Sequence, residues 1–589
     1  MKAKWSIFAV LVLVMSLLLA ACGGDKEETP NENGTDEPGT NEENNGTDDP
    51  EEDGDTTGFV APDASELHDE QVLNLLGGSE IPSMDTTQAT DAVSFTVMNN
   101  VFEGLYRMSW ENTPTPGVAE SVDISEDGMT YTFNLRTDAV WSNGTPVTAN
   151  DFLYAWKKAL HQDTLSPYAF IMSPIKNVNA IIGDSDEGED HELYGNVDAL
   201  GVTATDEHTL VVELEQPTAY FLGLTSFPTF HPQNEAYVTE QGEEYGLEAN
   251  TLIYNGPFVL SDWKHDEGWT YTKNPTYWDA ETVMLDAINV KIVKEVATGL
   301  NLYKTGEVDR AGLSSEHVDT YKNDPEYADQ FKTSKSPVLF YLKFNQKNEY
   351  LANLNIRKAL SLGWDKFGLT NEILANGSTP AYFHVPTDFV YDENGEDFRA
   401  KYGDFNVEDK TKAAQYWADG LAELGTDAIE VELLNYEGDS ARKIGEYLKN
   451  QLEGTLPGLT LTISQMPFKQ KLALEDAGDY EISFSGWGPD YQDPMTFIDM
   501  WVTGGNYNDL SYSNAEFDKL VTDAKKSSDF AARWDMLQEA ERILLEEDFA
   551  ICPMYQRGSS YLAQPYVKNY TIHPFGPDVS YKWTYIEKH

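Results

Sequence analysis

The sequence predicts a mixed α/β protein that contains more than one domain. From about Phe59 to the C-terminus, short segments with the two-residue periodicity of strands alternate with segments of helical periodicity. The chain has 589 residues, and at roughly 150 residues per domain this length suggests about two to four domains. Hydrophobic residues make up 40% and aromatic residues 12% of the chain, which is enough to build sizeable cores. We find no internal repeat, so a single repeating βα unit is not expected.

The N-terminus has the layout of a signal peptide. Lys2 and Lys4 precede an apolar run from Trp5 to Ala21, which ends in small residues before Cys22. A positive segment, an apolar segment and small residues in this order are typical of a secretory signal. As a permanent membrane span the run would be marginal in length. We therefore predict a signal peptide over residues 1–21.

The residues before the cysteine, Leu19-Ala20-Ala21-Cys22, resemble the lipobox of bacterial lipoproteins. The resemblance implies cleavage before Cys22 and a diacylglyceryl group on its sulfur, which would anchor the protein to a membrane. The alternative is an ordinary signal peptide followed by an incidental cysteine. The only other cysteine is Cys552, so no disulfide framework is expected.

Residues 22–58 are predicted to form a lipidated cysteine followed by a disordered acidic linker. The stretch after Cys22 has no aromatic or aliphatic residue and carries 14 acids against one base. The whole chain has a net charge of -60, and the residues beyond the linker still carry 86 acids and 37 bases. Such a field repels phosphate backbones, so nucleic acid is not an expected partner. An acidic surface of this kind suits a salty or alkaline medium, which we state as a hypothesis.

Two early segments show the clearest periodicity. "TYTFNLR" (130–136) predicts a strand that places Tyr131, Phe133 and Leu135 on one face. "TANDFLYAWKKAL" (148–160) predicts a helix capped near Thr148 or Asn150, with an apolar stripe on one side. The stripe consists of Phe152, Trp156 and Ala159.

Later segments follow the same logic. "LIYNGPFVLSDWK" (252–264) predicts a turn at Asn255-Gly256-Pro257 that leads into a strand. Ser513 and Glu516 predict a capping box for a helix that contains Phe517 and Leu520. A longer helix is expected from about Phe530 to Glu547, and "FAICPMY" (549–555) predicts a buried strand. The apolar face of the longer helix is predicted to contain Phe530, Trp534, Leu537 and Leu544.

The sequence shows no catalytic or metal-binding signature. It lacks H-E-x-x-H and G-x-S-x-G, and "GWGPDY" has Pro489 and Tyr491 where a dinucleotide loop needs glycine and a helix start. "GDSDEGED" (183–190) offers carboxylates without full calcium-loop spacing, so an acidic surface loop is the favoured interpretation. Cys552 is interpreted as a buried filler. A glycosidase-like pair of catalytic carboxylates remains an alternative, because the distance between two carboxylates in the fold cannot be derived from the sequence. No cofactor and no metal are expected.

Asp490 is an unusual carboxylate. In "SGWGPDYQDP" (485–494) it follows Trp487, Gly488 and Pro489, and no Lys or Arg lies nearby in sequence. A turn aspartate satisfied by backbone N–H groups is one explanation. The other is that a ligand supplies the counter-charge.

Several segments, in order along the chain, resemble the oligopeptide-binding proteins of bacterial ABC importers. They are "NNVFEGLYR" (99–107), "YTFNLRTDAVWSNGTPVTANDFLYAWKKAL" (131–160), "YNGPFVLSDW" (254–263), "KNPTYWD" (273–279), "NIRKALSLGWDK" (355–366) and "GWGPDYQDP" (486–494). The match extends from about Leu73 to the C-terminus. The resemblance implies a two-lobed periplasmic-binding-protein-like (Venus flytrap) fold with an extra third domain. The expected division is lobe I at 59–105, 226–335 and 556–589, the extra domain at 106–225, and lobe II at 336–555.

The resemblance also implies the ligand-binding residues. Asp490 matches the family aspartate that binds the α-ammonium of the peptide, and the Gly486-Trp487-Gly488 segment would bond to the peptide backbone. Ala89-Thr90-Asp91 is a second backbone candidate. Weaker candidates are Asn255 and Gly256, for which a plain strand connector is the alternative, Tyr555, for which core packing is the alternative, and Tyr491. Phe484 stands where relatives that grip short peptides can carry an Arg, which puts capture of the ligand's C-terminus in doubt.

The resulting expectation is a lipid-anchored receptor at the outer face of a Gram-positive cell membrane. It would bind oligopeptides as a monomer and deliver them to the permease subunits of an ABC transporter, and it would not be an enzyme. The alternatives are a receptor for another solute, such as a nickel complex, an oligosaccharide or a signalling peptide, and a surface hydrolase.

Overall fold

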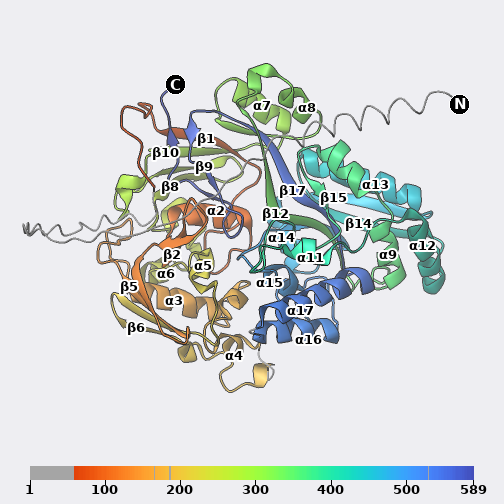
Figure 1. The fold of residues 1–589 in the computed structure, drawn as a ribbon, viewed down its shortest axis with the longest axis horizontal. Helices are drawn as coiled ribbons and strands as arrows, with labels where there is room; N and C mark the ends of the chain where they lie inside the picture. Colours follow the sequence, from red (N-terminus) through yellow and green to blue (C-terminus); the bar gives the residue numbers. More distant parts are fainter. Residues whose placement is uncertain (1–58, 165, 185–187, 528) are drawn as a thin grey trace, which may run out of the picture. The chain divides into compact units, whose positions relative to one another are not determined.

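The computed structural model describes residues 59–589, except 165, 185–187 and 528 (Figure 1). The predicted signal peptide, Cys22 and the acidic linker therefore lie outside the described residues. Within the described residues, no helix combines the length and the apolar character that crossing a bilayer requires.

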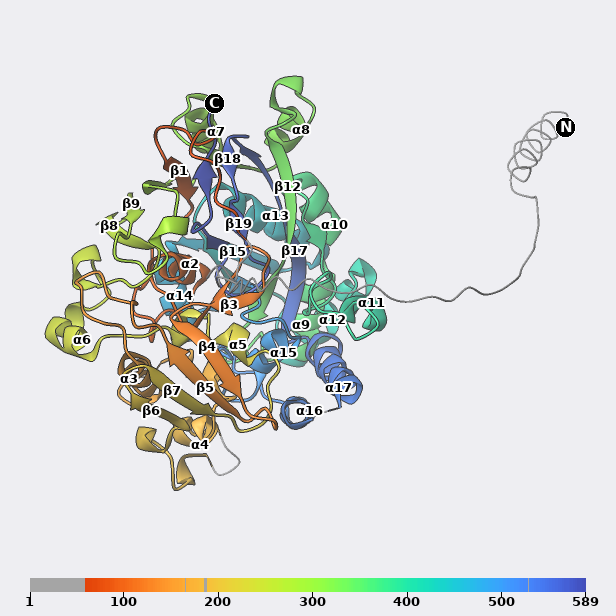
Figure 2. The ribbon, with the colours of Figure 1, turned by 60° about the vertical axis from the view of Figure 1, so that its left-hand side comes forward.

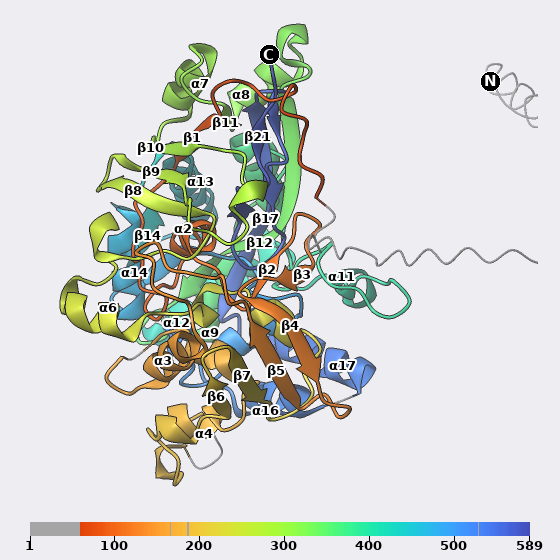
Figure 3. The same ribbon diagram turned by 90° about the vertical axis from the view of Figure 1, so that its left-hand side faces the viewer.

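Two four-stranded sheets organise the first half of the chain. The first has the order β1 (Val72–Gly77), β10 (Ala287–Ile292), β9 (Gly268–Lys273) and β8 (Phe258–Lys264). In it β1 pairs with β10 in parallel, and the other pairs are antiparallel. The second is antiparallel, with the order β4 (Ala119–Ile124), β5 (Thr130–Leu135), β7 (Thr209–Glu213) and β6 (Val202–Asp206). Figure 3 shows helix α3 (Ala149–Leu160) beside β6 and β7.

A seven-stranded mixed sheet dominates the second half. Its order is β11 (Arg310–Leu313), β17 (Ile551–Ala563), β12 (Phe331–Phe344), β16 (Ile482–Trp487), β14 (Ile429–Tyr436) and β15 (Leu459–Met466), with β13 (Thr379–Pro380) paired to β17. β14, helix α13 (Asp439–Thr455) and β15 form a crossover between parallel strands, because parallel neighbours cannot be joined by a tight turn.

β12 and β17 are the two longest strands and run antiparallel beside each other (Figure 2). Their register shifts between Lys335 and Leu339 and again between Phe340 and Tyr341. Such irregularities bend a strand and redirect its side chains. The first shift precedes the part of β12 that pairs with β16, and the second lies within it.

The remaining described elements are helices and short strand pairs. The helices are α2 (Ala92–Val101), α4 (Val178–Ile182), α5 (Phe221–Leu224), α6 (Glu235–Gln241), α7 (Val296–Lys304), α8 (Glu316–Lys322), α9 (Leu354–Leu362), α10 (Lys366–Gly368), α11 (Phe398–Tyr402), α12 (Lys410–Leu424), α14 (Phe468–Asp476), α15 (Met495–Ile498), α16 (Ala515–Lys526) and α17 (Phe530–Arg542). The short pairs are β2 (Tyr106–Met108) with β3 (Pro114–Pro116), β18 (Val567–Lys568) with β21 (Tyr585–Ile586), and β19 (Thr571–Ile572) with β20 (Val579–Ser580).

Most of the predicted elements are confirmed. β5 alternates partly exposed and buried residues, as its period of two requires. Helix α3 begins after Thr148, whose capping box with Asp151 is present, and its stripe is buried. The predicted turn leads into β8, and the predicted buried strand is the start of β17.

Two predictions about the C-terminal helices are wrong in part. The N-cap of α16 is Asn514, because its Oδ1 accepts hydrogen bonds from the backbone of Glu516 and Phe517, whereas Ser513 contacts Thr503. Phe530, the first residue of α17, is 47% exposed rather than part of a core. The first turn of a helix can extend beyond the surface that its later turns cover; Trp534, Leu537 and Leu544 are buried as predicted.

Candidate functional site

A cavity of about 540 Å³ lies beside strand β16. This volume is within the range of about 300–1,000 Å³ that small-ligand pockets occupy. The segments that line it come from both halves of the chain: the N-terminus of α2, strands β12, β16 and β17, and helices α13 and α14. Thr90, Asp91, Phe484, Gly486, Trp487, Gly488, Asp490 and Tyr555, all predicted from the sequence, line it.

β16 presents an unpaired edge to the cavity. One side of the strand pairs with β12 from Ile482 to Trp487, whereas the other side pairs with β14 only at Ile482 and Ser483. From Phe484 onward the second edge is therefore not bonded to β14. Gly486 is required here, because a Cβ at this position would lie 2.7 Å from the ring of Phe340. An exposed strand edge of this kind can accept an extended peptide as an added strand.

Asp490 lies just beyond the end of β16. The turn before it is fixed by the Gly576 amide, which donates to the Pro489 carbonyl at 2.8 Å, and the Asp490 amide donates to Thr496 Oγ1 at 3.1 Å. Asp490 is 9% exposed, and the Tyr168 hydroxyl donates to its carboxylate at 3.4 Å. Among the described residues, no Lys or Arg lies within ion-pair distance of this carboxylate.

Burial raises the pKa of the Asp490 carboxyl well above its usual range, and the nearby Asp499 carboxylate adds to the effect. The cause is the loss of water around a charge without a compensating cation. The alternative explanation, a turn aspartate satisfied by backbone N–H groups, has no support in the hydrogen bonds of the described residues. A cationic group placed beside Asp490 would restore the missing interaction.

Aromatic rings form the wall next to Asp490. The ring of Trp487 meets that of Tyr507 edge-on at 4.8 Å between centroids, and Tyr507 meets Tyr168 at 5.4 Å. The indole Nε1 of Trp487 is buried without a hydrogen-bond partner. Rings packed in this way exclude water, which strengthens electrostatic interactions at the neighbouring carboxylate.

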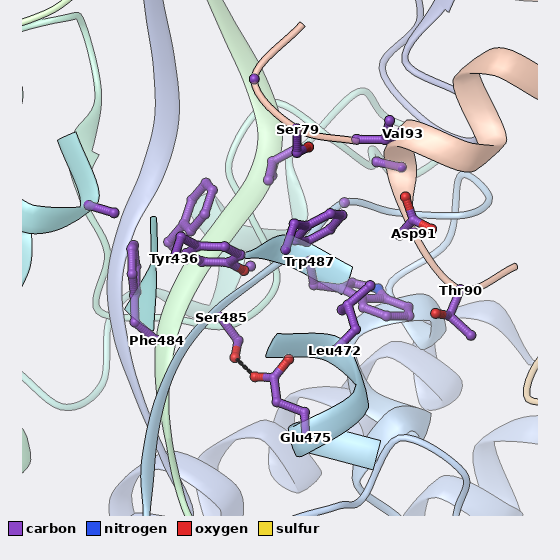
Figure 4. Close-up of a pocket in the computed structure, with 18 of the residues that line it drawn as sticks. Ser79, Thr90, Asp91, Val93, Tyr436, Leu472, Glu475, Phe484, Ser485 and Trp487 are labelled. Atoms are coloured by element: carbon purple, nitrogen blue, oxygen red, sulfur yellow. Dashed lines mark hydrogen bonds between the residues drawn. The ribbon is translucent and has the colours of Figure 1, made fainter. Parts of the chain in front are cut away.

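Thr90 and Asp91 line the cavity at the N-terminus of α2 (Figure 4). Asp91 is the N-cap of this helix, and its carboxylate accepts hydrogen bonds from the Ser94 amide at 2.9 Å and the Ser94 hydroxyl at 2.7 Å. Burial raises the pKa of Asp91 to about 6, although these hydrogen bonds oppose the effect. The side chain of Asp91 therefore has a structural role, whereas Thr90 and the backbone around it remain available to a ligand.

A buried charge network below β16 was not anticipated from the sequence. Glu475 on α14 contacts Lys471 at 2.7 Å and Lys343 at 3.1 Å, and it accepts hydrogen bonds from Ser483 and Ser485. Figure 4 shows the hydrogen bond from Ser485. Burial alone would raise the pKa of Glu475, but the two lysines hold it well below its usual range. Lys343 also pairs with Asp509. The four-residue spacing of Lys471 and Glu475 on a helix was the one signal in the sequence.

Four predicted residues, Ala89, Asn255, Gly256 and Tyr491, do not line the cavity. Asn255 hydrogen-bonds both backbone groups of Glu103, at 3.0 and 2.9 Å, and a Cβ on Gly256 would lie 2.6 Å from the Val101 carbonyl carbon. Tyr491 is buried and stacks on Tyr220 at 5.0 Å. The Asn255-Gly256 turn therefore joins β8 to the end of α2, in line with the alternative of a strand connector.

Comparisons with known proteins agree in one family. Residues 113–509 match the model of the bacterial extracellular solute-binding proteins, family 5. A dipeptide-binding protein of Lactococcus lactis is 32% identical over 529 residues, covering 86% of this chain and 93% of the relative. The oligopeptide-binding protein OppA of Bacillus subtilis is 31% identical over 568 residues, covering 94% of each chain.

Two solved structures are similar over most of the chain. The substrate-binding domain of an oligopeptide ABC transporter from Bacillus anthracis has a TM-score of 0.85 and 44% identity, covering 89% of this chain and all of that chain. Listeria monocytogenes OppA bound to peptide has a TM-score of 0.83 and 43% identity with the same coverage.

Proposed function

The chain belongs to family 5 of the bacterial extracellular solute-binding proteins, and we propose that it captures oligopeptides in the cavity beside β16. Its fold is the multi-domain, two-lobed α/β fold of this family, and it is a solute-binding protein rather than an enzyme. The observation that carries the proposal is the buried Asp490 carboxylate, which has no cationic partner among the described residues and lines the cavity.

We assign lobe I to 59–105, 226–335 and 556–589, the extra domain to 106–225, and lobe II to 336–555. The sheets support this division, because β1, β8, β9 and β10 fall in the first set, β4 to β7 in the second and β14 to β16 in the third. β12 and β17 would cross between the lobes and act as the hinge. The register shift that follows Lys335 places a bend in β12 at this boundary.

The amino terminus of the peptide would pair with Asp490. Two unit charges about 4 Å apart attract by roughly 4 kcal/mol at an effective dielectric of 20, before the cost of desolvation. Asp490 is already desolvated in the protein, so only the ligand's ammonium has to lose its water. The interaction should therefore be strong for a free α-ammonium.

The peptide backbone would pair with the free edge of β16 at Gly486, Trp487 and Gly488. Main-chain hydrogen bonds are common to all peptides, so this grip does not depend on side chains. Thr90 and its neighbours, on the lobe I side of the cavity, would hold the other edge of the peptide. A ligand that touches both lobes favours the closed arrangement.

Contacts within the chain already join the proposed lobes. The Gly576 amide donates to the Pro489 carbonyl at 2.8 Å, and Lys443 lies 3.7 Å from Glu316. The ion pair between Lys294 and Glu437 joins the proposed lobes at 2.5 Å, but its side chains are 33% and 29% exposed. Pairs at such sites contribute about 0–1 kcal/mol. A peptide that contacts both lobes would add to these contacts and favour closure further.

Titration calorimetry with hexaalanine tests the role of Asp490. Replacing it by asparagine (Asp490→Asn) should weaken binding of the free peptide by about 1–3 kcal/mol, because the ligand's charge is left without a partner. N-acetylation of the peptide should weaken binding to the unmodified protein by a similar amount. Acetylation should have little further effect on the variant, since both changes remove the same interaction.

The exposed Asp163 does not line the cavity and gives a control of equal charge change, because Asp163→Asn alters the net charge by the same amount. Its affinity should match that of the unmodified protein. Unchanged binding by Asp490→Asn, or additive losses from the variant and from acetylation, would overturn the assignment of the ammonium site.

We further propose that Cys22 carries a lipid that anchors the protein to the outer face of a Gram-positive cell membrane. The protein would act there as a monomer that delivers peptides to the permease subunits of an ABC transporter. Acyl chains contribute about 0.8 kcal/mol per buried CH₂. Cys22→Ala should therefore move the protein from the membrane fraction to the soluble fraction, as followed by immunoblot; retention on the membrane would argue against the anchor.

A further inference from the structure

A separate cavity of about 420 Å³ lies among residues that we assign to lobe I. It is bounded by β1, by the adjoining ends of β11, β12 and β17, and by the C-terminal segment that follows β17. Figure 3 shows β1 and β11 close together at this end of the molecule. The cavity shares no lining residue with the cavity beside β16. We call it the Arg310 cavity, and its volume is sufficient for a small ligand.

The register of the sheet brings two cationic side chains to the face that borders this cavity. Tyr561 of β17 is opposite Lys332 of β12 and Gly312 of β11. Arg310 lies two residues before Gly312 and therefore shares its face, because side chains alternate along a strand. The other face, to which Leu562 belongs, packs against α7 and α8. Arg310, Lys332 and Tyr561 are thus gathered on the face that these helices leave uncovered.

Arg310 is held in place by aromatic rings. Its guanidinium carbon lies 3.7 Å from the ring centroid of Tyr561 and 4.5 Å from that of Tyr570. Tyr570 in turn contacts the ring of the buried Tyr581 at 5.7 Å. A guanidinium held by cation–π contacts keeps its N–H groups as hydrogen-bond donors.

Those donors have no acceptor in the protein. Among the described residues, no group accepts a hydrogen bond from Arg310 and no carboxylate lies within ion-pair distance of it. Every other arginine in the described part of the chain donates at least one hydrogen bond to a protein acceptor. The arrangement of Arg310 is therefore unusual for this protein, in which acids outnumber bases by 100 to 40.

The cavity contains more bases than acids, in contrast to the chain as a whole. The charged residues that line it are Arg310, Lys332, Lys568, Asp309 and Asp329. Lys568 pairs with Glu587 at 3.1 Å. Within the described ranges, Lys332 has no carboxylate within ion-pair distance. Arg310 and Lys332 therefore remain available to an anion.

The two acids of the cavity do not neutralise these cations. Asp309 accepts hydrogen bonds from the Asn74 amide and the Tyr566 hydroxyl, both at 2.7 Å. Asp329 is exposed and lies outside ion-pair distance of the bases that line the cavity. An anion that entered would meet two unpaired cations.

The rest of the lining is largely apolar. Leu73 and Leu75 of β1 contribute to one wall, and Val567 and Ile572 of the C-terminal segment contribute to another. Leu73 and Leu75 are buried, whereas Ile572 is 39% exposed. The exposed Lys332 and Ile572 give solutes access to the cavity from solvent. Apolar walls of this kind favour a ligand with an apolar body.

We propose that the Arg310 cavity binds a small organic anion in which a carboxylate is attached to an apolar body. A carboxylate can accept two parallel N–H bonds from a guanidinium, which are the bonds that Arg310 does not make within the protein. Lys332 adds positive charge on the same face, and the leucines of β1 would cover the apolar body. This site is independent of peptide capture beside β16.

Titration calorimetry with three probes tests the chemistry of the site. Hydrocinnamate, a phenyl ring on a short chain that ends in a carboxylate, should bind. Hydrocinnamamide has the same body without the charge and should bind at least about tenfold more weakly, because it cannot form charge-assisted bonds through a carboxylate. Inorganic phosphate should also bind more weakly, since it makes no use of the apolar walls.

Variants of the lining residues locate the binding. Arg310→Gln should weaken hydrocinnamate at least about tenfold, and Arg310→Lys should weaken it several-fold because the charge is kept but the planar fork is lost. The exposed Lys332→Gln should weaken it several-fold as well, and this change does not disturb a packed side chain. Ile572→Ala should lower the affinity through lost apolar contact.

Arg442→Gln is the control of equal charge change. The side chain of Arg442 is 47% exposed and lines neither cavity. This variant should bind hydrocinnamate as the unmodified protein does. Urea unfolding of each variant shows whether it is folded.

Equal affinity for the acid and its amide would overturn the proposal, and so would the absence of binding to the unmodified protein. Affinity that is unchanged in both Arg310→Gln and Lys332→Gln would place the probe elsewhere and also overturn it. Phosphate that binds more tightly than hydrocinnamate would refute the apolar body of the ligand. These outcomes leave the assignment of the peptide site untouched, because none of them involves the cavity beside β16.

Discussion

At the scale of single residues, two aspartates three positions apart have opposite environments. Asp490 is buried without a cation among the described residues, whereas Asp493 forms two hydrogen bonds with the guanidinium of Arg533, at 2.7 and 2.8 Å. The two look alike in the sequence "GPDYQDP". An unpaired buried charge lowers the stability of the folded protein, and breaking a buried pair does so as well, because it leaves one buried charge without its partner. A binding site can retain an unpaired buried carboxylate although it lowers stability, because the bound ligand supplies the missing partner.

Asp490→Asn should therefore stabilise the ligand-free protein at neutral pH by on the order of 1 kcal/mol. The pKa of Asp490 is raised in the folded protein, so the folded state holds its proton at pH values where the unfolded chain has lost it. The resulting loss of stability is absent below the normal pKa of an aspartate and develops as the pH rises through and above that value. Urea unfolding of the unmodified protein and of Asp490→Asn can be measured from about pH 3.5 to about pH 8. The free energies of unfolding should differ only toward the upper end of this range.

Asp493→Asn is the matched control from the same segment. It should destabilise the protein at neutral pH by on the order of 3 kcal/mol, since it leaves the largely buried Arg533 unpaired. Equal destabilisation by both asparagine variants would mean that Asp490 already has a partner within the protein.

At the scale of secondary-structure elements, local patterns predicted where strands and helices occur but not what their connections contact. The alternation in β5 and the capping box of α3 depend only on residues near in sequence. The Asn255-Gly256 turn was also visible, yet its contacts with the end of α2 come from residues about 150 positions away. Its assignment to the ligand site relied on the family resemblance rather than on those contacts.

Gly256→Ala should destabilise the fold without changing the affinity of the folded protein for peptide. A Cβ at Gly256 would lie 2.6–2.7 Å from backbone atoms of Val101 and Phe102, which cannot move without shifting α2. Overpacking of this kind costs about 1–3 kcal/mol. Thermal unfolding and calorimetry with hexaalanine measure the two quantities separately.

Gly454→Ala, near the end of α13, is the comparison, because its Cβ would enter open space and alanine favours helix by about 0.5–1 kcal/mol. It should not destabilise the protein. If Gly256→Ala loses affinity for peptide and Gly454→Ala does not, the Asn255-Gly256 turn would belong to the ligand-binding site after all.

At the scale of the whole molecule, the charge is far from balanced. The chain carries 100 acids and 40 bases, and the excess persists after the acidic linker is set aside. Like charges on one surface repel one another and lower the stability of the compact state. Salt screens these interactions beyond a distance of about 10 Å at 0.1 M.

The melting temperature should consequently rise by about 2–4 °C as NaCl is increased from about 20 mM to about 0.5 M, as measured by differential scanning calorimetry. A variant in which exposed acids such as Glu126, Asp163 and Glu243 become amides should rise less. A melting temperature that does not change over this range would contradict both the repulsion and the hypothesis of a salty or alkaline medium.

The sequence by itself determined the α/β class, most of the strands and helices, the family, and the lack of a cation near Asp490 along the chain. Only the tertiary structure decided which residues share the cavity: it brought Phe484 together with Tyr436 and Tyr555, placed Glu475 between two lysines, and kept Asn255 and Tyr491 out. The physical reason is the separation along the chain over which each kind of interaction acts. Periodicity, capping and turn propensity act over a few neighbouring residues, whereas ion pairs and cavity walls depend on contacts between segments that are dozens to hundreds of positions apart.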